Sequence, residues 1–553
     1  MFSSSVLDGR HDQAFPTLTS TEIDRIRRFG VPRSFKAGDA LSRAGSPNEG
    51  VLVILSGTVE VTRSDQFGTR DVIATHGGGS FMGELAQLSG RPSLVDAEAA
   101  DSVDALLIAP DRLRALIIAE AEIGERLMRA MILRRVGLLE TASGGPIIMG
   151  RPQQGDALRL AGFLRRNGHP HQLLDIENDP GAIALVEKFQ IDPGQLPIVL
   201  CADGRILRNP SEVELARCLG MVRPIDAGRI YDTAIVGAGP AGLAAAVYAA
   251  SEGLSVLVLD CRSFGGQAGA SARIENYLGF PTGISGMALM ARAYNQAQKF
   301  GVDMAIPSEA ATFHRRSDGQ FSLTLQSGEQ ASARAVVIAT GARYRHLNVA
   351  NLDAFEMSSI HYWASPLEAR LCSGHDVALV GAGNSAGQAV VYLATQARKV
   401  FMIVRGRSLA ATMSRYLVDR IEGLPNVEVM TETQIAALSG QDGILETVRL
   451  RNGAGAESIQ SIRHLFLFIG ADPNTDWLAN TGVALDGKGF VLTGADVDGG
   501  RCNLETSVEG VFAIGDVRSG STKRVAAGVG EGAQVVAILH RYLADVAELK
   551  QAG

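Results

Sequence analysis

The chain has 553 residues, of which 46% are hydrophobic and 20% charged, and its formal net charge is −7. This length predicts roughly three to four domains and excludes a single small binding module. The composition is that of a globular protein, which excludes a disordered or fibrous chain. The acidic balance argues against a protein whose main task is to neutralise nucleic-acid phosphates or an anionic membrane surface.

Five cysteines are spread along the chain without any C-x-x-C pair: Cys201, Cys218, Cys261, Cys372 and Cys502. They are too few for a disulfide framework, and we expect Cys201 and Cys218 to be small core residues rather than a disulfide. His169 and His171 lack a nearby third ligand, so no metal site is expected. The first residues lack the regions of a signal peptide, and no stretch reaches about 18 uncharged apolar residues. We therefore expect a cytoplasmic protein without membrane insertion.

Residues 1–142 predict an all-β unit that is closed by a helix. Short strands and turns occur in SFKAGDAL, GVLVILSGTVEVT and RDVIATHGGGSFMGEL, and a helical stretch runs from Pro110 to about Glu140. The segments KAGDAL, VILSGTVEV and FMGELAQLSGRPSLV resemble the cyclic-nucleotide-binding domain. No helix-turn-helix pattern follows, so a nucleic-acid partner is not expected.

That resemblance implies a phosphate site where a helix begins after Gly83, with Glu84 binding the ribose 2'-hydroxyl. Ser93 occupies the position of the arginine that neutralises the cyclic phosphate in the family, and Arg91 is close to it in sequence. A cyclic nucleotide or another small ligand is therefore the expected partner. Its candidate contacts are Gly83, Glu84, Leu85, Arg91 and Ser93.

Residues 146–224 predict a compact αβ module. Strands PIIMG and HQLLDI alternate with helices DALRLAGFLRRNG and PGAIALVEKFQI, and strands in LPIVLCADGRILRN precede the helix SEVELARCLG. The order resembles a thioredoxin or glutaredoxin fold, with Pro197 placed like the cis-proline of that family. The family's dithiol would follow the first strand, where this chain has MGRPQQGD. The resemblance therefore implies a module without redox activity.

Two later segments repeat one pattern of strand, glycine turn and helix: TAIVGAGPAGLAAAVYAA and VALVGAGNSAGQAVVYLA. The first contains G-x-G-x-x-G, and its next strand ends at Asp260. In the second, Ala386 takes the place of the third glycine, and its next strand leads to Arg405. Such a turn lets a pyrophosphate approach the backbone at a helix N-terminus. Two copies predict two nucleotide sites.

The residues after the second strand of each copy indicate which nucleotide binds. Asp260 can accept hydrogen bonds from a ribose diol, whereas Arg405 and Arg407 can pair with a 2'-phosphate. We therefore interpret the first copy as a flavin-type site and the second as an NADP site. The alternative for the two arginines is a solvated strand end.

From about residue 229 to 548 the sequence resembles the low-molecular-weight thioredoxin reductases. The motifs that carry the resemblance are IVGAGPAGLAAA, FGGQ, IENYLGFPTGISG, IATGARYR, VGAGNSAGQA, FIGADPNTDWL and AIGDVRSGSTKRVAAGVGEG. The resemblance implies a discontinuous FAD-binding domain, 229–346 and 472–553, around an NAD(P)-binding domain, 347–471. The domains would rotate to bring nicotinamide onto flavin. A homodimer is also implied.

The resemblance also implies the residues that bind FAD and NADPH. For FAD they are Gly237, Gly239, Pro240, Ala241, Gly242, Asp260, Gly266, Gln267, Asn276, Ala339, Thr340, Gly341, Gly515, Asp516, Arg524 and Val525. For NADP they are Gly381, Gly383, Asn384, Ser385, Arg405 and Arg407.

One departure from the family concerns its redox cysteines. A C-x-x-C precedes the second glycine turn in the family, but Trp363 and Pro366 hold those positions here, and neither carries electrons by thiol chemistry. Cys372 is a single thiol, which we expect to be structural. The catalytic residues are therefore left open, and thioredoxin reduction by the usual route is not expected.

The sequence thus predicts a multidomain protein with an all-β domain, an α/β thioredoxin-like domain and two Rossmann-like domains. The leading hypothesis is an NADPH-dependent FAD oxidoreductase with an N-terminal regulatory domain. Its electron acceptor is a disulfide on a partner, a quinone or other small oxidant, or an iron–sulfur carrier, as in ferredoxin-NADP reductases. The alternative is a flavin and nucleotide sensor with little turnover.

Overall fold

The structure is a computed structural model of the 553-residue chain, in which secondary structure falls into four units. The described residues are 11–46, 49–64, 70–83, 92–140, 145–179, 182–183, 186, 192–201, 205–222, 224–271, 273–356, 358–364, 366–441 and 443–552.

The N-terminal unit is a β-sandwich of two four-stranded sheets, ordered β1-β8-β3-β6 and β2-β7-β4-β5. The predicted helix from Pro110 is two helices, because the backbone bends at Glu120, whose carboxylate binds Arg25 and Arg28. The elements are α2 (His11–Ala14), α3 (Ser20–Ile26), β1 (Val31–Phe35), β2 (Ala40–Ser42), β3 (Val51–Ser56), β4 (Val59–Ser64), β5 (Arg70–His76), β6 (Phe81–Met82), β7 (Asp96–Ala99), β8 (Val103–Ile108), α5 (Pro110–Ala119) and α6 (Ala121–Glu140).

The middle unit, residues 145–222, is built on a mixed sheet of order β10-β9-β11-β12, in which β9 and β10 are parallel and β11 is antiparallel to β9. The Leu196–Pro197 peptide bond before β11 is cis. Ser211 and Glu214 form a capping box at the start of α9. The predicted helix at 180–191 falls mostly outside the described residues. The elements are β9 (Ile147–Gly150), α7 (Gly155–Arg166), β10 (Gln172–Asp175), β11 (Ile198–Leu200), β12 (Ile206–Arg208) and α9 (Glu212–Cys218).

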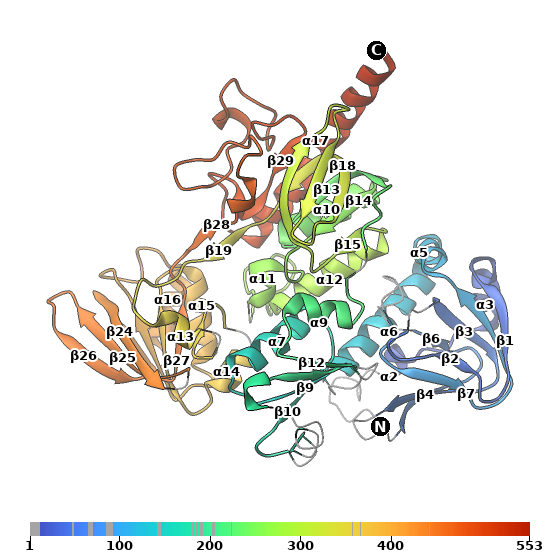
Figure 1. Ribbon diagram of the computed structural model, residues 1–553, viewed down its shortest axis with the longest axis horizontal. Coiled ribbons are helices and arrows are strands. Elements are labelled where there is room, and N and C mark those ends of the chain that lie inside the picture. The colour runs from blue at the N-terminus through green and yellow to red at the C-terminus, as the bar shows by residue number, and fades with distance from the viewer. Residues whose placement is uncertain are drawn as a thin grey trace.

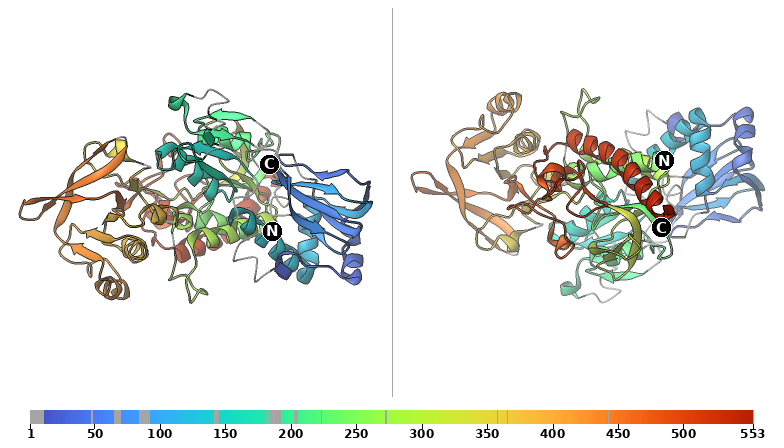
Figure 2. Two further views of the ribbon diagram at one scale, coloured as in Figure 1. Left: turned by 90° about the horizontal axis from the view of Figure 1, so that it is seen from below. Right: turned by 90° about the horizontal axis from the view of Figure 1, so that it is seen from above.

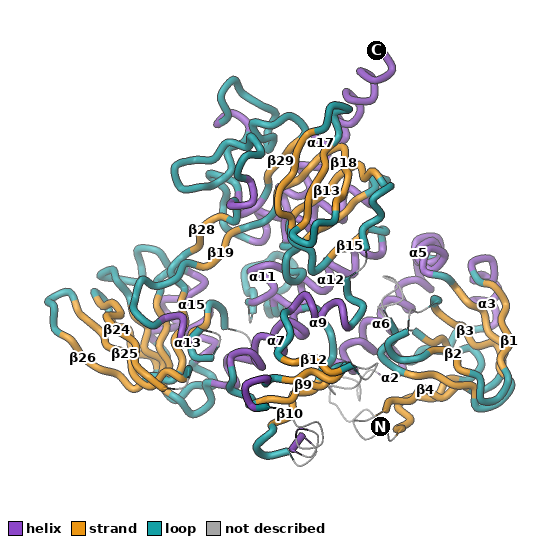
Figure 3. The backbone as a smooth tube through the Cα atoms, in the orientation of Figure 1, coloured by secondary structure: helices purple, strands orange, loops and turns teal. Residues whose placement is uncertain are grey.

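The seven-stranded unit combines residues 229–341 with 474–552 around one sheet of order β15-β14-β13-β18-β17-β16, and β29 pairs with β18. Strands β13, β14, β15, β18 and β29 run parallel, and their apolar residues are buried on both faces. The elements are β13 (Ile230–Val236), α10 (Pro240–Ser251), β14 (Val256–Leu259), α11 (Gly266–Ala270), α12 (Gly286–Lys299), β15 (Asp303–Ala305), β16 (Ala310–Arg315), β17 (Phe321–Leu325), β18 (Gln330–Ile338), β29 (Val511–Ala513) and α17 (Val525–Ala552). Figure 3 shows that loops make up much of the chain before β29.

The five-stranded unit, residues 346–469, has a parallel sheet of order β20-β27-β21-β22-β23 and an antiparallel β24-β25-β26 meander. Strands β19 (Ala342–Tyr344) and β28 (Ala471–Pro473) pair where the chain enters and leaves this unit. The other elements are α13 (Leu352–Phe355), β20 (Ile360–His361), α14 (Pro366–Leu371), β21 (Asp376–Val380), α15 (Asn384–Leu393), β22 (Lys399–Ile403), α16 (Arg415–Glu422), β23 (Val427–Met430), β24 (Thr433–Gln441), β25 (Ile444–Asn452), β26 (Glu457–Ser461) and β27 (His464–Leu467).

The N-terminal and five-stranded units lie at opposite ends of the molecule (Figures 1 and 2). The middle unit lies between them, and its helix α7 is drawn beside α14 and below α11. Arg135 of α6 donates to the Gly168 carbonyl at 2.9 Å, so the middle unit also contacts the N-terminal unit. Within the described residues, no helix is both long enough and apolar enough to span a membrane.

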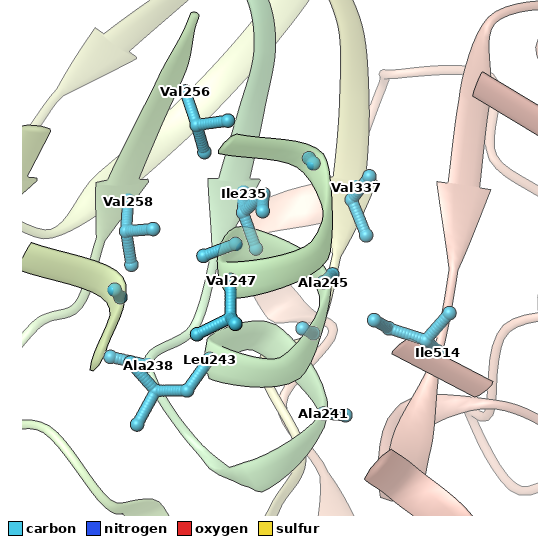
Figure 4. Packing of buried hydrophobic residues seen from close by; sticks show 14 of the residues in the cluster. Ile235, Ala238, Ala241, Leu243, Ala245, Val247, Val256, Val258, Val337 and Ile514 are labelled. Atoms are coloured by element: carbon cyan, nitrogen blue, oxygen red, sulfur yellow. The ribbon is translucent and has the colours of Figure 1, made fainter. Parts of the chain in front are cut away.

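The core of the seven-stranded unit depends on a close contact between α10 and α17. Apolar side chains of α10 lie over Ile235, Val258 and Val337 of the sheet (Figure 4). On α17, a Cβ atom at Gly532 would lie 2.6 Å from the Ala241 carbonyl oxygen. A side chain at this position therefore forces the helices apart. The contact joins the C-terminal helix to the first helix of the unit.

Replacing Gly532 by Ala is expected to lower the free energy of unfolding by about 1–3 kcal/mol, because the added methyl group overpacks the α10–α17 contact. Gly530→Ala is the matched control on the same helix, since a Cβ there meets no atom within 4 Å. It should stabilise the protein by about 0.5–1 kcal/mol through helix propensity. Urea denaturation followed by circular dichroism measures both changes, and equal effects of the two variants would contradict this packing argument.

Candidate functional site

The first glycine turn joins β13 to α10 at the carboxyl edge of the seven-stranded sheet. Gly237 has φ +115°, and a Cβ there would lie 2.2 Å from the Ala339 carbonyl oxygen. A Cβ on Gly242 would lie 1.9 Å from the Gly237 carbonyl oxygen. By contrast, a Cβ on Gly239 would meet only the Gly266 Cα, at 4.0 Å. The loop is therefore packed on its inner side and open at the N-terminus of α10, as an anion site requires.

Asp260 follows β14 and is predicted to bind a ribose. Its carboxylate already accepts hydrogen bonds from the backbone N–H groups of Ala238 at 2.9 Å, Arg262 at 3.0 Å and Ser263 at 3.1 Å. Burial raises the pKa of Asp260, and these three N–H groups oppose that rise. A carboxylate has about four acceptor positions, so little capacity remains for a ribose. Asp260 thus fixes the glycine turn directly, a role that the sequence pattern did not indicate.

The predicted residues of the FGGQ motif lie against the same turn. A Cβ on Gly266, which has φ +54°, would lie 3.2 Å from the Gly239 Cα. The Gln267 side chain donates to the Ala342 carbonyl at 2.5 Å and so links α11 to β19. Asn276 lies in an exposed bend farther along the chain. The structure thus brings Gly266 to the turn, directs Gln267 to β19 and leaves Asn276 at the surface.

The predicted segment Ala339–Gly341 lies where β18 leads into β19. The Thr340 hydroxyl donates to the Asn474 carbonyl at 2.8 Å, and the Asn474 amide donates back to the Thr340 carbonyl at 2.9 Å. The Asn474 N–H also donates to the Gly341 carbonyl at 3.0 Å. Asn474 therefore fastens the two chain segments that connect the seven-stranded and five-stranded units.

The predicted C-terminal residues face the first turn from β29 and α17. Gly515 has φ +72°, and a Cβ there would lie 2.9 Å from the Ala241 Cβ. The Gly515 N–H donates to Glu531 at 2.6 Å. Burial raises the pKa of Asp516, whereas Lys523 lowers it. Arg524 and Val525 stand at the start of α17, where Val525 is the first helical residue.

The second glycine turn joins β21 to α15 in the five-stranded unit. Gly381 has φ +148°, and a Cβ there would lie 2.5 Å from the Phe468 carbonyl oxygen and 3.1 Å from the Ala386 Cβ. Gly383 is the N-cap of α15, and no atom lies within 4 Å of a Cβ built on it. Asn384 accepts a hydrogen bond from the Ser414 N–H at 2.7 Å. Ser385 is in the first turn of α15.

Arg405 and Arg407 follow β22 at the same edge of the sheet, and both are exposed. Arg407 forms an ion pair with Glu432 at 3.1 Å. Among the described residues, Arg405 has no carboxylate partner. Arg405 is therefore the better placed of the two to meet an added phosphate.

Trp363, which is expected to replace the first redox cysteine of the family, lies where β20 leads into α14. Its indole N–H donates to Glu368 at 3.0 Å, and the Arg166 guanidinium lies 4.0 Å from its ring centroid. Pro366 begins α14, but its side chain lies outside the described residues. Burial raises the pKa of the Cys372 thiol to about 12, with Glu368 adding to the rise. Cys372 is buried and unreactive, in agreement with the expected structural role.

Arg166 and Tyr344 were not singled out from the sequence, yet both belong to this region. The Tyr344 and Trp363 rings are 6.4 Å apart. Burial raises the pKa of Tyr344 to about 12, opposed by the Arg166 cation and assisted by the Asp516 carboxylate. Tyr344 therefore connects the surroundings of Trp363 electrostatically with those of Asp516. No sequence signal joins residues this far apart along the chain.

In the N-terminal unit, the candidate ligand contacts are only partly described. Gly83 follows β6 with φ +145°, and the buried Ser93 donates its hydroxyl to the Val95 carbonyl at 2.8 Å. Three further candidates lie outside the described residues: Glu84, Leu85 and Arg91.

Arg134 of α6 is a buried cation that the sequence analysis missed. Its guanidinium donates to the carbonyls of Ala14, Phe81 and Gly83 at 2.8–3.0 Å. Burial lowers the pKa of Arg134 to about 9. The arginine lies within an apolar helical stretch, which is the signal that could have identified it. It ties the closing helix to the strand that leads into the candidate ligand loop.

Cys201 and Cys218 form a disulfide in the structure, so the prediction that they are separate core residues is wrong. The bond joins the end of β11 to the last residue of α9. Because the two cysteines are 17 positions apart in sequence, no local motif indicated the pairing. His169 and His171, also in this unit, contact the backbone carbonyls of Pro170 and His169.

Residues 231–532 match the family model described as pyridine nucleotide-disulphide oxidoreductase. The chain belongs to this family. Its N-terminal residues 32–120 match the model of the cyclic nucleotide-binding domain. These two matches confirm the expected resemblances in the corresponding parts of the chain.

The relatives of this family member include thioredoxin reductases. It is 32% identical over 322 residues to the thioredoxin reductase of Mycolicibacterium smegmatis, covering 57% of this chain and 97% of the relative. It is 33% identical over 326 residues to NADPH-dependent thioredoxin reductase 3 of Arabidopsis thaliana, covering 57% and 58% of the two chains. The crystal structure of T. acidophilum thioredoxin reductase matches with a TM-score of 0.53 and 28% identity, over 57% of this chain and 99% of that chain.

Thioredoxin reductases use FAD and NADPH, and this oxidoreductase has suitable surroundings for both. The first turn is open at Gly239, and Gly515 of η5 (Gly515–Val517), next to Asp516 in sequence, lies against Ala241 just after this turn, so the residues present fit a dinucleotide there. The second turn is likewise open at Gly383, with the cationic Arg405 at the adjacent strand end. Both sites lie where parallel sheets bind nucleotides.

Arg405→Ala is expected to raise the KM for NADPH by roughly 10- to 100-fold, the loss expected for a charge-assisted phosphate contact. The KM for NADH should change little, because NADH lacks the 2'-phosphate. Steady-state kinetics with both nucleotides and one acceptor measure the two constants. Equal effects on NADPH and NADH would reject the assignment of Arg405 to the phosphate.

Proposed function

We propose that the chain is an NADPH-dependent FAD oxidoreductase that delivers electrons to an acceptor outside the chain. The observation that supports this proposal best is the pair of open glycine turns, at Gly239 and Gly383, on two sheets that the β19 and β28 segments connect. The bound flavin supplies the hydride and electron chemistry, while the protein holds and orients both nucleotides.

The domain assignment follows from the sheets that carry these turns. We assign the FAD-binding domain to 229–346 and 472–553, and the NAD(P)-binding domain to 347–471. The first support is the return of α17 onto α10, which makes two distant segments one unit. The second is the antiparallel pairing of β19 with β28 at the junction.

The FAD site comprises the predicted residues that line the carboxyl edge of the seven-stranded sheet. Gly239 and the N-terminus of α10 would receive the pyrophosphate. Asp516 would meet the ribityl chain, and Asp260 would act chiefly by holding the glycine turn through Ala238. For NADPH, Gly383 and α15 would receive the pyrophosphate and Arg405 the 2'-phosphate.

The residue at position 363 indicates that this chain passes electrons to its acceptor by a different route from that of ordinary thioredoxin reductases. Trp363 has no thiol, and Cys372 is buried. The exposed Cys261 and Cys502 are far apart in sequence and do not form a C-x-x-C. The free cysteines thus provide no C-x-x-C to which the flavin could pass electrons. A partner disulfide, a quinone or other small oxidant, and an iron–sulfur carrier are the acceptor classes compatible with this arrangement.

Two further domains complete the proposal. The sheet order of the middle unit and its cis-Pro197 support a thioredoxin or glutaredoxin-like domain at 146–224 without the C-x-x-C. The cyclic nucleotide-binding match supports a regulatory domain at 1–142. If calorimetry detects no binding of cyclic AMP or cyclic GMP, and neither nucleotide alters turnover, regulation by these ligands is excluded.

Anaerobic addition of NADPH to the purified yellow protein should bleach the flavin absorbance with one equivalent per flavin. NADH should do so more slowly, because it lacks the phosphate that Arg405 would bind. A stopped-flow spectrophotometer measures both reactions. Flavin that remains oxidised in the presence of NADPH would overturn the reductase proposal and favour a flavin and nucleotide sensor with little turnover.

A further inference from the structure

A cavity of about 270 Å³ lies where the middle, seven-stranded and five-stranded units meet. Helix α7 contributes Arg165 and Arg166 to its wall. The seven-stranded unit contributes Ala270 and Met287, and the five-stranded unit contributes His361 and Trp363. The volume is near the lower end of the roughly 300–1,000 Å³ range of small-molecule sites. All three units must be in place to enclose it.

Arginines outnumber carboxylates on the cavity wall, where Glu368 is the acidic residue. Two of its arginines already have carboxylate partners, since Arg159 pairs with Asp156 at 3.0 Å and Arg262 with Glu212 at 2.6 Å. Arg165 and Arg166, by comparison, form no hydrogen bond or ion pair with any residue that the structure describes. Two half-buried guanidinium groups without such partners favour an anionic ligand.

Both cations remain charged at neutral pH. Burial lowers the pKa of Arg166 to about 10, and the nearby Arg262 cation adds to this effect, whereas Glu368 opposes it. Burial also lowers the pKa of Arg165. Glu368 is the carboxylate that lines the cavity, and it accepts the Trp363 indole N–H. An anion in the cavity would offset the cost of burying these two cations.

The other residues that line the cavity indicate the shape and polarity of the rest of the ligand. Met287, Ile360 and Leu158 are apolar, while Tyr362 and Trp363 are aromatic. The Arg166 guanidinium uses one face to cover the indole at 4.0 Å, which leaves its N–H edge for an anionic group. A flat organic molecule with one acidic group matches this combination of surfaces.

The cavity lies close to the segments that are expected to surround the flavin. Ala270 is at the end of α11, three residues after Gln267, and Gly266 at the start of that helix contacts the first glycine turn. Trp363 stands at the position of the family's redox cysteine. Arg166 of α7 lies over the Trp363 ring at 4.0 Å, so the middle unit restricts the approach of a partner protein to this side chain. A small molecule in the cavity reaches Trp363 directly, because Trp363 lines the cavity.

We infer that this cavity binds the electron acceptor, and that the acceptor is a small, flat organic anion of the quinone type. The inference rests on the proposed reductase function and names its substrate class. In the net reaction, NADPH loses a hydride and becomes NADP⁺. The quinone takes up that hydride's two electrons and one proton, together with a second proton from solvent, and becomes the hydroquinone.

The first test compares 1,4-naphthoquinone-2-sulfonate with the neutral 2-methyl-1,4-naphthoquinone as acceptors for the FAD-loaded full chain. Arg165→Met and Arg166→Met remove charge while keeping an extended side chain. Each should raise the KM for the sulfonate about tenfold or more, as expected for one charge-assisted contact. The KM for the neutral quinone should change less than twofold.

Arg151→Met is the matched control, because Arg151 belongs to the same unit but forms an exposed ion pair with Glu177. It should leave both constants unchanged. Reactions without enzyme measure the rate at which each quinone oxidises NADPH directly, and this rate is subtracted. If the sulfonate and the neutral quinone respond equally to the Arg165 and Arg166 variants, the inference is wrong.

A second measurement detects binding without turnover. The chain has only two tryptophans, so Trp477→Phe leaves Trp363 as the sole indole reporter. Titration with the redox-inert benzenesulfonate should then change Trp363 fluorescence saturably, and adding Arg165→Met should weaken that binding about tenfold. Absence of a saturable change would overturn the inference even if NADPH bleaches the flavin. Failure of NADPH to bleach the flavin would instead identify failure of the proposed function.

Discussion

The close packing of α10 against α17 is the contact on which the reductase part of the chain depends. Gly532 lets the two helices approach until a Cβ would lie 2.6 Å from the Ala241 carbonyl. This contact returns the last segment of the chain to the first glycine turn and places Gly515 beside Ala241. It therefore brings together segments that are nearly 300 residues apart in sequence.

Much of the nucleotide-binding architecture could be predicted because its determinants are local. A buried strand, a glycine turn and a helix follow one another within about 20 residues, so Gly237 and Gly381 were recognisable from spacing alone. The end of β14 before Asp260 was likewise foreseeable. The three hydrogen bonds that Asp260 accepts were not, since they depend on how the turn folds back on the strand.

The features that escaped prediction are contacts between distant segments. Arg166 and Trp363 are almost 200 residues apart, and nothing in the periodicity of either segment indicates that they stack. The Cys201–Cys218 disulfide is likewise a contact between separate elements, since it joins the end of β11 to α9. Sequence patterns therefore located the two glycine turns, whereas the surroundings of Trp363 became visible only in three dimensions.

Covalent attachment of the middle unit changes which molecules can compete for the face that it covers. A tethered domain occupies its site at an effective concentration that is about millimolar for short connections. A free protein at micromolar concentration would need roughly a thousandfold advantage in affinity to displace α7 from Trp363. In the observed arrangement, a protein would have to displace the middle unit to cover this face of the reductase, whereas a solute small enough for the cavity would not.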